Sequence, residues 1–185
     1  MVKNLNRKQS VLWITCTAVF IALLIVMQAA TAPLGNSIVT GSIVNLLLVT
    51  SVMTCGLSSG LTVAAVSPVM AKFLGIGPLW SLIPFIAAGN VALALLWHFI
   101  GNSRTRRKYA AYLAALLCAS ATKFLVLYIG IVRIAVPLFL GLPEAQAAVV
   151  SGMFSIPQLI TALVGGALAI VIFPRVKRAI AVVRE

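Results

Sequence analysis

The stretch VLWITCTAVFIALLIVMQAATA, residues 11–32, decides the class of this protein. It carries no charged side chain and is longer than the roughly 20 apolar residues that a helix needs to cross a bilayer. Cations at positions 3–8 precede it, as in a secretory signal peptide. The apolar run exceeds the usual length of about 7 to 15 residues for such a peptide, however, and cleavage after Ala32 would fall before Pro33. We therefore expect a first membrane-spanning helix.

The whole chain has the composition of a membrane protein. Of its 185 residues, 62% are hydrophobic and 9% are charged, and the mean hydropathy is +1.16. A soluble domain is about 45 to 50% apolar and about 25% charged. Because apolar runs recur as far as Phe173, lipid must be the solvent for most of the chain. We expect residues 1–185 to form a single integral domain of the cell membrane.

The apolar runs divide the chain into spans of an all-α, polytopic protein. An uncharged turn, Gly56–Gly60, separates the two shortest runs and favours two helices over one broken helix. Six spans place both termini on the same side of the membrane. The expected spans are residues 11–32, 39–55, 61–74, 79–100, 109–137 and 147–173.

The basic residues give the orientation. The net charge is +12, and the cations cluster at positions 3–8, 104–108 and 175–178, beside apolar spans. Cytoplasmic loops of membrane proteins carry such an excess of Lys and Arg, so we expect both termini in the cytoplasm. No aromatic residues for base stacking interleave with these clusters, which argues against nucleic acid and leaves lipid headgroups as their partners.

Several kinds of chemistry lack the residues that they need. There is no Gly-x-x-x-x-Gly-Lys-Ser/Thr phosphate loop, so ATP hydrolysis would have to come from partner subunits. Glu144 and Glu185 are the only acids, which excludes paired-carboxylate catalysis and carboxylate-bound metals. The lone His98 lies near the cytoplasmic end of the fourth span, where we expect an interfacial role. We expect no catalytic residue, no metal site and no cofactor.

The three cysteines, Cys16, Cys55 and Cys118, lie within or beside apolar runs. Their odd number and the absence of a short spacing argue against a disulfide framework and against a zinc site. We expect them to act as small hydrophobic residues.

Polar side chains far from either membrane surface are the candidate binding residues. Lys123 lies midway along the fifth span, Asn90 midway along the fourth and Gln158 midway along the sixth. A central Lys costs about 2.5 to 3.5 kcal/mol in lipid, so it should face a cavity or a partner. Asn90 and Gln158 either line that cavity or only hydrogen-bond neighbouring helices. Asn45, in the second span, is a further candidate.

Two further candidates lie beyond Lys123 in the fifth span. Arg133 follows it by ten residues, about 15 Å along a continuous α-helix. It either holds the far end of an elongated ligand or pairs with Glu144 in the next loop. Tyr128 combines a ring face with a hydroxyl group at a depth that suits a ligand.

The first span contains Thr17-Ala18-Val19-Phe20-Ile21-Ala22-Leu23-Leu24 after a basic amino terminus. In a chain of this size with six short spans, this arrangement resembles the substrate-binding S components of energy-coupling factor transporters, over nearly the whole chain. In that family an Ala-x-x-x-Ala motif of the first helix docks on a transmembrane coupling subunit, and Ala18 and Ala22 match it. Small residues four apart let another helix approach closely. The segment from Ser67-Pro68 through Gly75-Ile76-Gly77-Pro78 to Gly89-Asn90 is also similar to the third-to-fourth helix region of that family.

The resemblance implies a function in uptake. It implies that a vitamin or similar micronutrient is captured from outside in a cavity closed by the loop after the first helix, here residues 33–40. It also implies a coupling subunit and two ATPase subunits as partners, against which the loaded subunit topples to release its ligand inside.

The substrate itself stays open at this point. Cations without matching acids favour an anionic ligand, and biotin, pantothenate, nicotinate, lipoate and folate are all admissible. A neutral ligand remains possible if Lys123 contacts carbonyl groups. The alternatives from other classes are a small intramembrane enzyme, which needs an acid, base or nucleophile in register, and a scaffold without ligand, which gives no reason for a central unpaired Lys.

Overall fold

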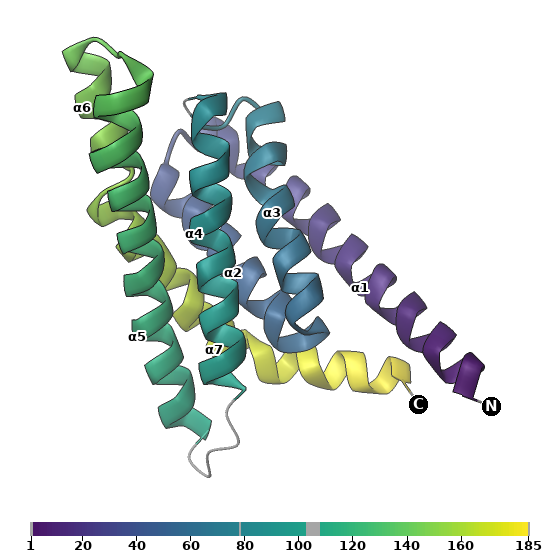
Figure 1. Cartoon of the computed structure of the whole chain (residues 1–185). Coiled ribbons are helices and arrows are strands. Elements are labelled where there is room, and N and C mark those ends of the chain that lie inside the picture. The colour runs from purple at the N-terminus through teal and green to yellow at the C-terminus, as the bar shows by residue number, and fades with distance from the viewer. Residues whose placement is uncertain (1, 78, 103–107, 185) are drawn as a thin grey trace.

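The computed structural model describes residues 2–77, 79–102 and 108–184, and within these ranges the chain is all-helical, without a strand (Figure 1). Short connections join the helices. In chain order they are α1 (Val2–Thr31), η1 (Ala32–Leu34), α2 (Ser37–Cys55), α3 (Leu57–Phe73), η2 (Trp80–Leu82), α4 (Ile83–Leu96), η3 (Trp97–Gly101), α5 (Lys108–Leu127), η4 (Tyr128–Leu140), α6 (Glu144–Met153) and α7 (Ile156–Arg184).

Five helical segments of the described chain are long and apolar enough to cross a membrane, which supports an integral membrane protein. The helix α3 has 17 residues and is the shorter apolar helix of the bundle. The five segments are Trp13–Leu34, Ser37–Cys55, Trp80–Gly101, Lys108–Leu140 and Glu144–Arg178.

The helices form a bundle with two distinct ends. The start of α1 and the end of α7 lie together at one end, which we call the terminal end (Figure 1). The opposite end holds the α1–α2 connection and α6, and we call it the distal end. Of the expected basic loop, Lys108 is exposed at the start of α5, whereas residues 103–107 lie outside the described residues.

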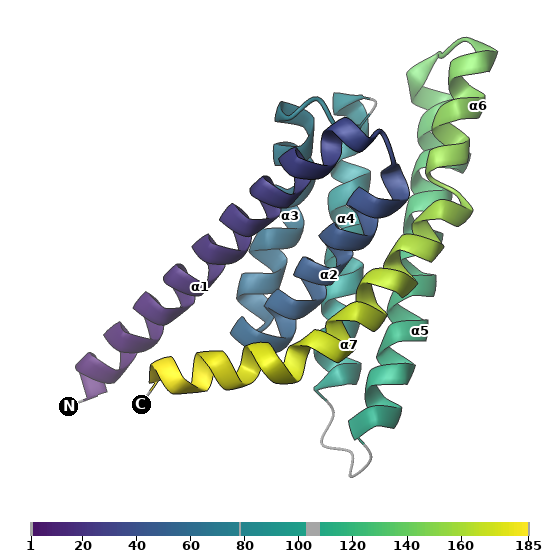
Figure 2. The same ribbon diagram turned by 180° about the vertical axis from the view of Figure 1, so that it is seen from behind.

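The helix α7 changes direction along its length. Its last part turns aside and crosses the terminal end of the bundle (Figure 2). Pro174 lies inside this helix, and a proline there removes a backbone hydrogen bond and bends the helix. Arg175, Lys177 and Arg178 follow it and are exposed, so the cationic part of α7 leaves the apolar bundle as soon as the expected sixth span ends.

Glycine allows α2 and α7 to touch. A Cβ atom added at Gly165 of α7 would overlap the carbonyl oxygen of Ser42 and lie 2.6 Å from Cβ of Asn45, both on α2. At Gly41 of α2, an added Cβ would lie 3.0 Å from Cγ2 of Thr161 on α7. Larger residues would hold the two backbones apart, so these glycines set the spacing of the helix pair that carries Asn45 and Thr161.

The turn between α2 and α3 is shorter than the sequence predicts. Only Gly56, with φ at 90°, lies between the two helices, and residues 57–60 already belong to α3. This tight connection is possible because Gly60 packs against Val52 where a Cβ atom would overlap the Val52 side chain.

The fifth and sixth spans also differ from continuous α-helices. Beyond Leu127 the fifth becomes the π-helix η4, which ends at Leu140 and is followed by Gly141 with φ at 52°. The sixth is broken between α6 and α7 at residues 154–155. Pro157 is the second residue of α7, where a helix needs no backbone N–H donor, so this proline starts a helix rather than kinking one.

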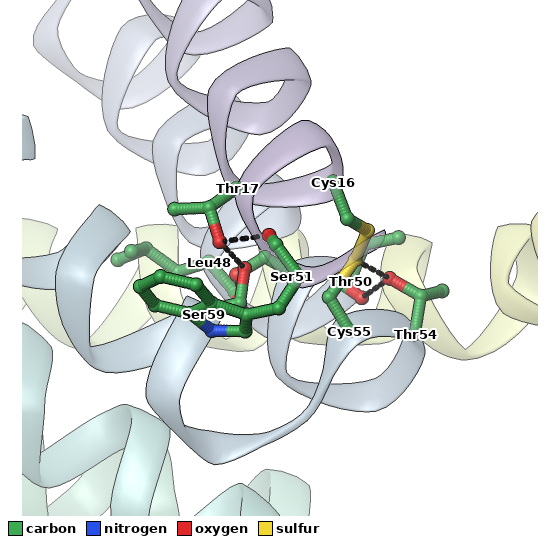
Figure 3. Close-up of a disulfide and its surroundings, with 9 residues drawn as sticks. Cys16, Thr17, Leu48, Thr50, Ser51, Thr54, Cys55 and Ser59 are labelled. Carbon is green, nitrogen blue, oxygen red and sulfur yellow. Dashed lines mark hydrogen bonds between the residues drawn. A yellow bond between two sulfur atoms is a disulfide. The ribbon is translucent and has the colours of Figure 1, made fainter. Parts of the chain in front are cut away.

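A disulfide joins Cys16 of α1 to Cys55 of α2, with Cα atoms 6.3 Å apart, so the expectation of three unpaired cysteines is wrong for this pair (Figure 3). Cys118 is the free cysteine and is exposed. The antiparallel packing of α1 against α2 brings together residues 39 positions apart in sequence, which spacing alone does not reveal. Next to the disulfide, the hydroxyl groups of Thr17 and Ser59 hydrogen-bond at 3.0 Å and tie α1 to α3 as well (Figure 3).

Candidate functional site

A cavity of about 160 Å³ extends from the distal end toward the middle of the bundle. It reaches the surface beside Ser37 and Gly77, which are exposed. Most of its wall is apolar, with Val44, Ile83 and Phe154 among its residues. Polar groups also line it, among them Asn45, Asn90, Lys123 and Gln158. A largely apolar cavity with a few convergent polar groups is the usual form of a small-molecule site.

Lys123 is the centre of the polar group. It lies near the middle of the segment Lys108–Leu140, and only 3% of its surface is exposed. Its ammonium group donates hydrogen bonds to Oδ1 of Asn45 at 2.6 Å and to Oδ1 of Asn90 at 2.7 Å. An ammonium group has three N–H donors. Two of them go to these amides, and none of the described protein groups accepts the third.

These contacts also fix how the two amides point. Since an ammonium group only donates, each amide must turn its oxygen toward Lys123 and its nitrogen away. Asn45 Nδ2 then donates to Oγ1 of Thr161 at 3.3 Å, and Asn90 Nδ2 donates to the carbonyl oxygen of Ala64 at 3.4 Å. The hydroxyl of Thr161 donates in turn to the carbonyl oxygen of residue 158, at 3.0 Å. One hydrogen-bonded chain therefore links α3, α4, α5, α2 and α7.

The chain of hydrogen bonds leaves the charge of Lys123 uncompensated. Amide oxygens offer partial negative charge but no net charge. Glu144, the acid among the described residues, is exposed at the start of α6. A buried cation without a counter-ion is costly in a protein interior. The geometry thus presents one positive charge and one unused N–H donor at the wall of an otherwise apolar cavity.

Gln158 lines the cavity from α7 and holds the break before that helix in place. Its Nε2 donates to the carbonyl oxygen of Met153 at 3.1 Å, at the end of α6. The interruption between α6 and α7 frees this carbonyl from a helical partner, and the Gln158 amide satisfies it. Gln158 is therefore both a lining residue and a structural one.

Arg133 and Tyr128 lie outside this cavity. Arg133 is exposed, with Cζ 5.5 Å from the centre of the Tyr128 ring, and Tyr128 stacks on Phe124 at 5.6 Å between ring centres. Among the described residues, no ion pair joins Arg133 to Glu144. The prediction that Arg133 lies about 15 Å from Lys123 along the span assumes a continuous α-helix. The π-helix η4 hydrogen-bonds five residues apart instead of four and so directs its side chains differently.

Lys72 lies at the mouth of the cavity. Its Nζ donates to the carbonyl oxygen of Gly77 at 3.3 Å, so it belongs to the connection between α3 and α4. The first helix contributes a residue that sequence reasoning missed, Gln28, which lines the cavity and is 3% exposed. The sequence does contain a signal for Gln28, because it is a carboxamide one turn before the end of the first predicted span. For that span the sequence predicts only a docking surface.

The alanines of the expected docking motif, Ala18 and Ala22, do not line the cavity. Ala18 and Ala22 are exposed on α1, and Val26 and Ala29 continue the exposed strip toward the distal end. This strip has no covering helix among the described residues.

Comparison with family models, curated proteins and solved structures finds no match to this chain. Inference about function therefore rests on the cavity, on its charge and on the exposed face of α1.

Proposed function

We propose that this chain is the substrate-binding membrane subunit of an energy-coupling-factor-type importer. In this role it captures a small, vitamin-like anion from outside the cell and passes it on through a coupling module. The observation that carries the proposal is Lys123 in the cavity wall. One of its N–H donors is directed to neither Asn45 nor Asn90, and no carboxylate of the described residues balances its charge.

The proposal includes a six-span topology with both termini in the cytoplasm. The 17 residues of α3 measure about 25 Å at 1.5 Å per residue, and this helix stands beside α4 in the bundle (Figure 1). The cations at the terminal end, on α7 and at the start of α5, favour a cytoplasmic location for that end. With this orientation the distal end, and with it the mouth of the cavity, faces outside.

An anion is the ligand that best suits the cavity. A carboxylate beside Lys123 would accept the third N–H and supply the missing counter-charge at once. The apolar wall would hold the rest of the molecule by excluding water from it. Asn45 and Asn90 hold the ammonium group in a fixed position, so that the site is formed before the ligand arrives.

Coupling to transport is proposed to use the exposed face of α1. Ala18 and Ala22 present backbone and methyl groups rather than long side chains, and a helix of a coupling subunit could approach closely there. Two ATPase subunits on that coupling subunit would supply the energy, since the chain has no phosphate loop of its own.

Mass spectrometry of small molecules retained by the purified protein, followed by titration of variants with the compound found, tests the proposal. Lys123→Met deletes the charge and keeps the length of the side chain. Losing a charge-assisted hydrogen bond of about 1.5 to 3 kcal/mol should weaken binding by about ten- to a hundredfold. Lys123→Arg, which keeps the charge, should bind more tightly than Lys123→Met.

Arg133→Met is the matched control. It removes one cation from the same span, outside the cavity, and should leave the dissociation constant unchanged. Equal dissociation constants for wild type and a folded Lys123→Met protein would refute the role of this lysine and with it the argument for an anion.

A further inference from the structure

Gln28 lines the cavity, and its carboxamide oxygen is buried without a hydrogen-bond partner among the described residues. It lies on α1, near the α1–α2 connection, and 97% of its surface is covered. The other amides of the wall are occupied: Asn45 and Asn90 accept from Lys123, and Gln158 donates to a backbone carbonyl. Each of these three amides has at least one hydrogen bond, whereas no described residue bonds the carboxamide of Gln28.

The backbone that carries Gln28 is held in place. One turn further along α1, the hydroxyl group of Thr31 hydrogen-bonds that of Thr40 on α2 at 2.9 Å. Thr31 also donates to the carbonyl oxygen of Met27 at 2.8 Å. Since the Thr31–Thr40 contact joins α1 to α2 at this corner of the cavity, the Gln28 side chain starts from a defined position on its wall.

A carboxamide oxygen accepts hydrogen bonds, and buried acceptors in folded proteins almost always have a donor. The ligand is the remaining source of a donor for Gln28, and it reaches this oxygen once the carboxamide turns toward the cavity, because the oxygen is covered in the ligand-free structure. Lys123 needs the opposite kind of partner from Gln28, because its free N–H requires an acceptor. The two residues lie on different helices, α1 and α5, so one molecule between them would need an acid group at one point and an N–H or O–H group at another.

The size of the cavity limits how large that molecule is. Its volume of about 160 Å³ is close to the roughly 150 Å³ of an engineered apolar cavity that binds benzene. Val44, Ile83, Ile86 and Phe154 supply apolar surface for a ring-sized body. A two-ring compound would have to extend out through the mouth.

Resting on the proposed function, we infer that the site selects a compact organic acid of about one six-membered ring that also carries a hydrogen-bond donor. In this inference Gln28 accepts the hydrogen bond from that donor. Lys123 binds the acid group, and the apolar wall covers the ring. Gln28 then distinguishes a ligand with an O–H or N–H group from an equally large ligand without one.

Benzoate and its 3- and 4-substituted hydroxyl and methyl derivatives are suitable probes, because hydroxyl and methyl groups are similar in size and only the hydroxyl donates. Binding is measured by titration calorimetry with the full chain in lipid nanodiscs. In wild type, at least one hydroxybenzoate should bind about five- to tenfold more tightly than the matching methylbenzoate. In Gln28→Met this ratio should fall to about one. Val26→Met, on the exposed face of the same helix, should keep the wild-type ratio.

Two results would overturn the inference about Gln28: equal affinity for hydroxyl and methyl derivatives in wild type, or an unchanged ratio in Gln28→Met. Failure of all five probes to bind would overturn the compact-acid class. The proposed importer function would still stand in these cases if a retained compound binds in a Lys123-dependent way. If the probes bind and discriminate through Gln28 but Lys123→Met binds them as wild type does, the anion site fails and the donor-reading role of Gln28 stands.

Discussion

A double-mutant cycle between Lys123 and Asn45 tests whether the hydrogen-bonded centre of the bundle works as one unit. Asn45→Leu keeps the approximate volume of the side chain and removes the acceptor that lies 2.6 Å from the ammonium group. A hydrogen bond to a charged group contributes about 1.5 to 3 kcal/mol. We therefore expect Asn45→Leu to lower the free energy of unfolding by about 2 kcal/mol in wild type.

The same substitution should cost much less in the Lys123→Met background. There the cation is already absent, and replacing Asn45 removes an amide oxygen that has lost its donor. Lys123→Met alone should change stability little, because the loss of two hydrogen bonds is offset by no longer burying a charge. The coupling energy between the two positions should thus be about 1.5 to 2 kcal/mol.

Reversible unfolding in mixed micelles, followed by tryptophan fluorescence, measures these values, since Trp97 is buried in the bundle. Asn45→Leu in an Arg133→Met background is the control and should cost as much as it does in wild type. An equal cost of Asn45→Leu with and without Lys123 would refute the idea that this contact stabilises the fold.

Three further predictions concern packing, assembly and redox state. Gly165→Val should destabilise the protein by more than about 2 kcal/mol and abolish ligand binding, because its side chain would force α7 away from α2; a thermal melt with wild-type stability and intact binding would contradict this. Replacing Ala18 and Ala22 together by Leu should weaken copurification with a coexpressed coupling subunit without affecting ligand binding; a complex that survives both changes would exclude docking on this strip. Protein purified without reductant should show one thiol that reacts with an alkylating agent and three after reduction, whereas three reactive thiols before reduction would show that Cys16 and Cys55 are not joined.

Depth within an apolar segment predicts which polar side chains line the cavity. Lys123, Asn45, Asn90 and Gln158 come from different segments of the sequence, and the structure brings them to one cavity. A polar side chain in the middle of a span has few ways to avoid lipid except to face inward, so position alone predicts its direction. Depth does not single out Gln28, because it lies near the end of its span, where an amide can also reach the membrane surface.

The predicted positions of Arg133 and Tyr128 and the predicted state of the cysteines differ from the structure for geometric reasons. The prediction that Arg133 and Tyr128 face the ligand assumes a regular α-helix beyond Lys123. No local sequence rule indicates that η4 winds as a π-helix. The pairing of Cys16 with Cys55 depends on which helices become neighbours. Hydropathy predicts the existence of helices well, but it contains little about their mutual contacts.

The two ends of α1 are fastened unequally. Near the terminal end, the disulfide and the Thr17–Ser59 contact hold the helix to both α2 and α3. Near the distal end, the Thr31–Thr40 hydroxyl pair is the hydrogen bond that holds it to α2. A single hydroxyl pair breaks and reforms far more readily than a covalent bond, so the place of Gln28 in the cavity wall depends on the weaker of the two fastenings. Gln28 keeps this place while the Thr31–Thr40 contact is intact, and loss of the contact would open the cavity wall at the distal end.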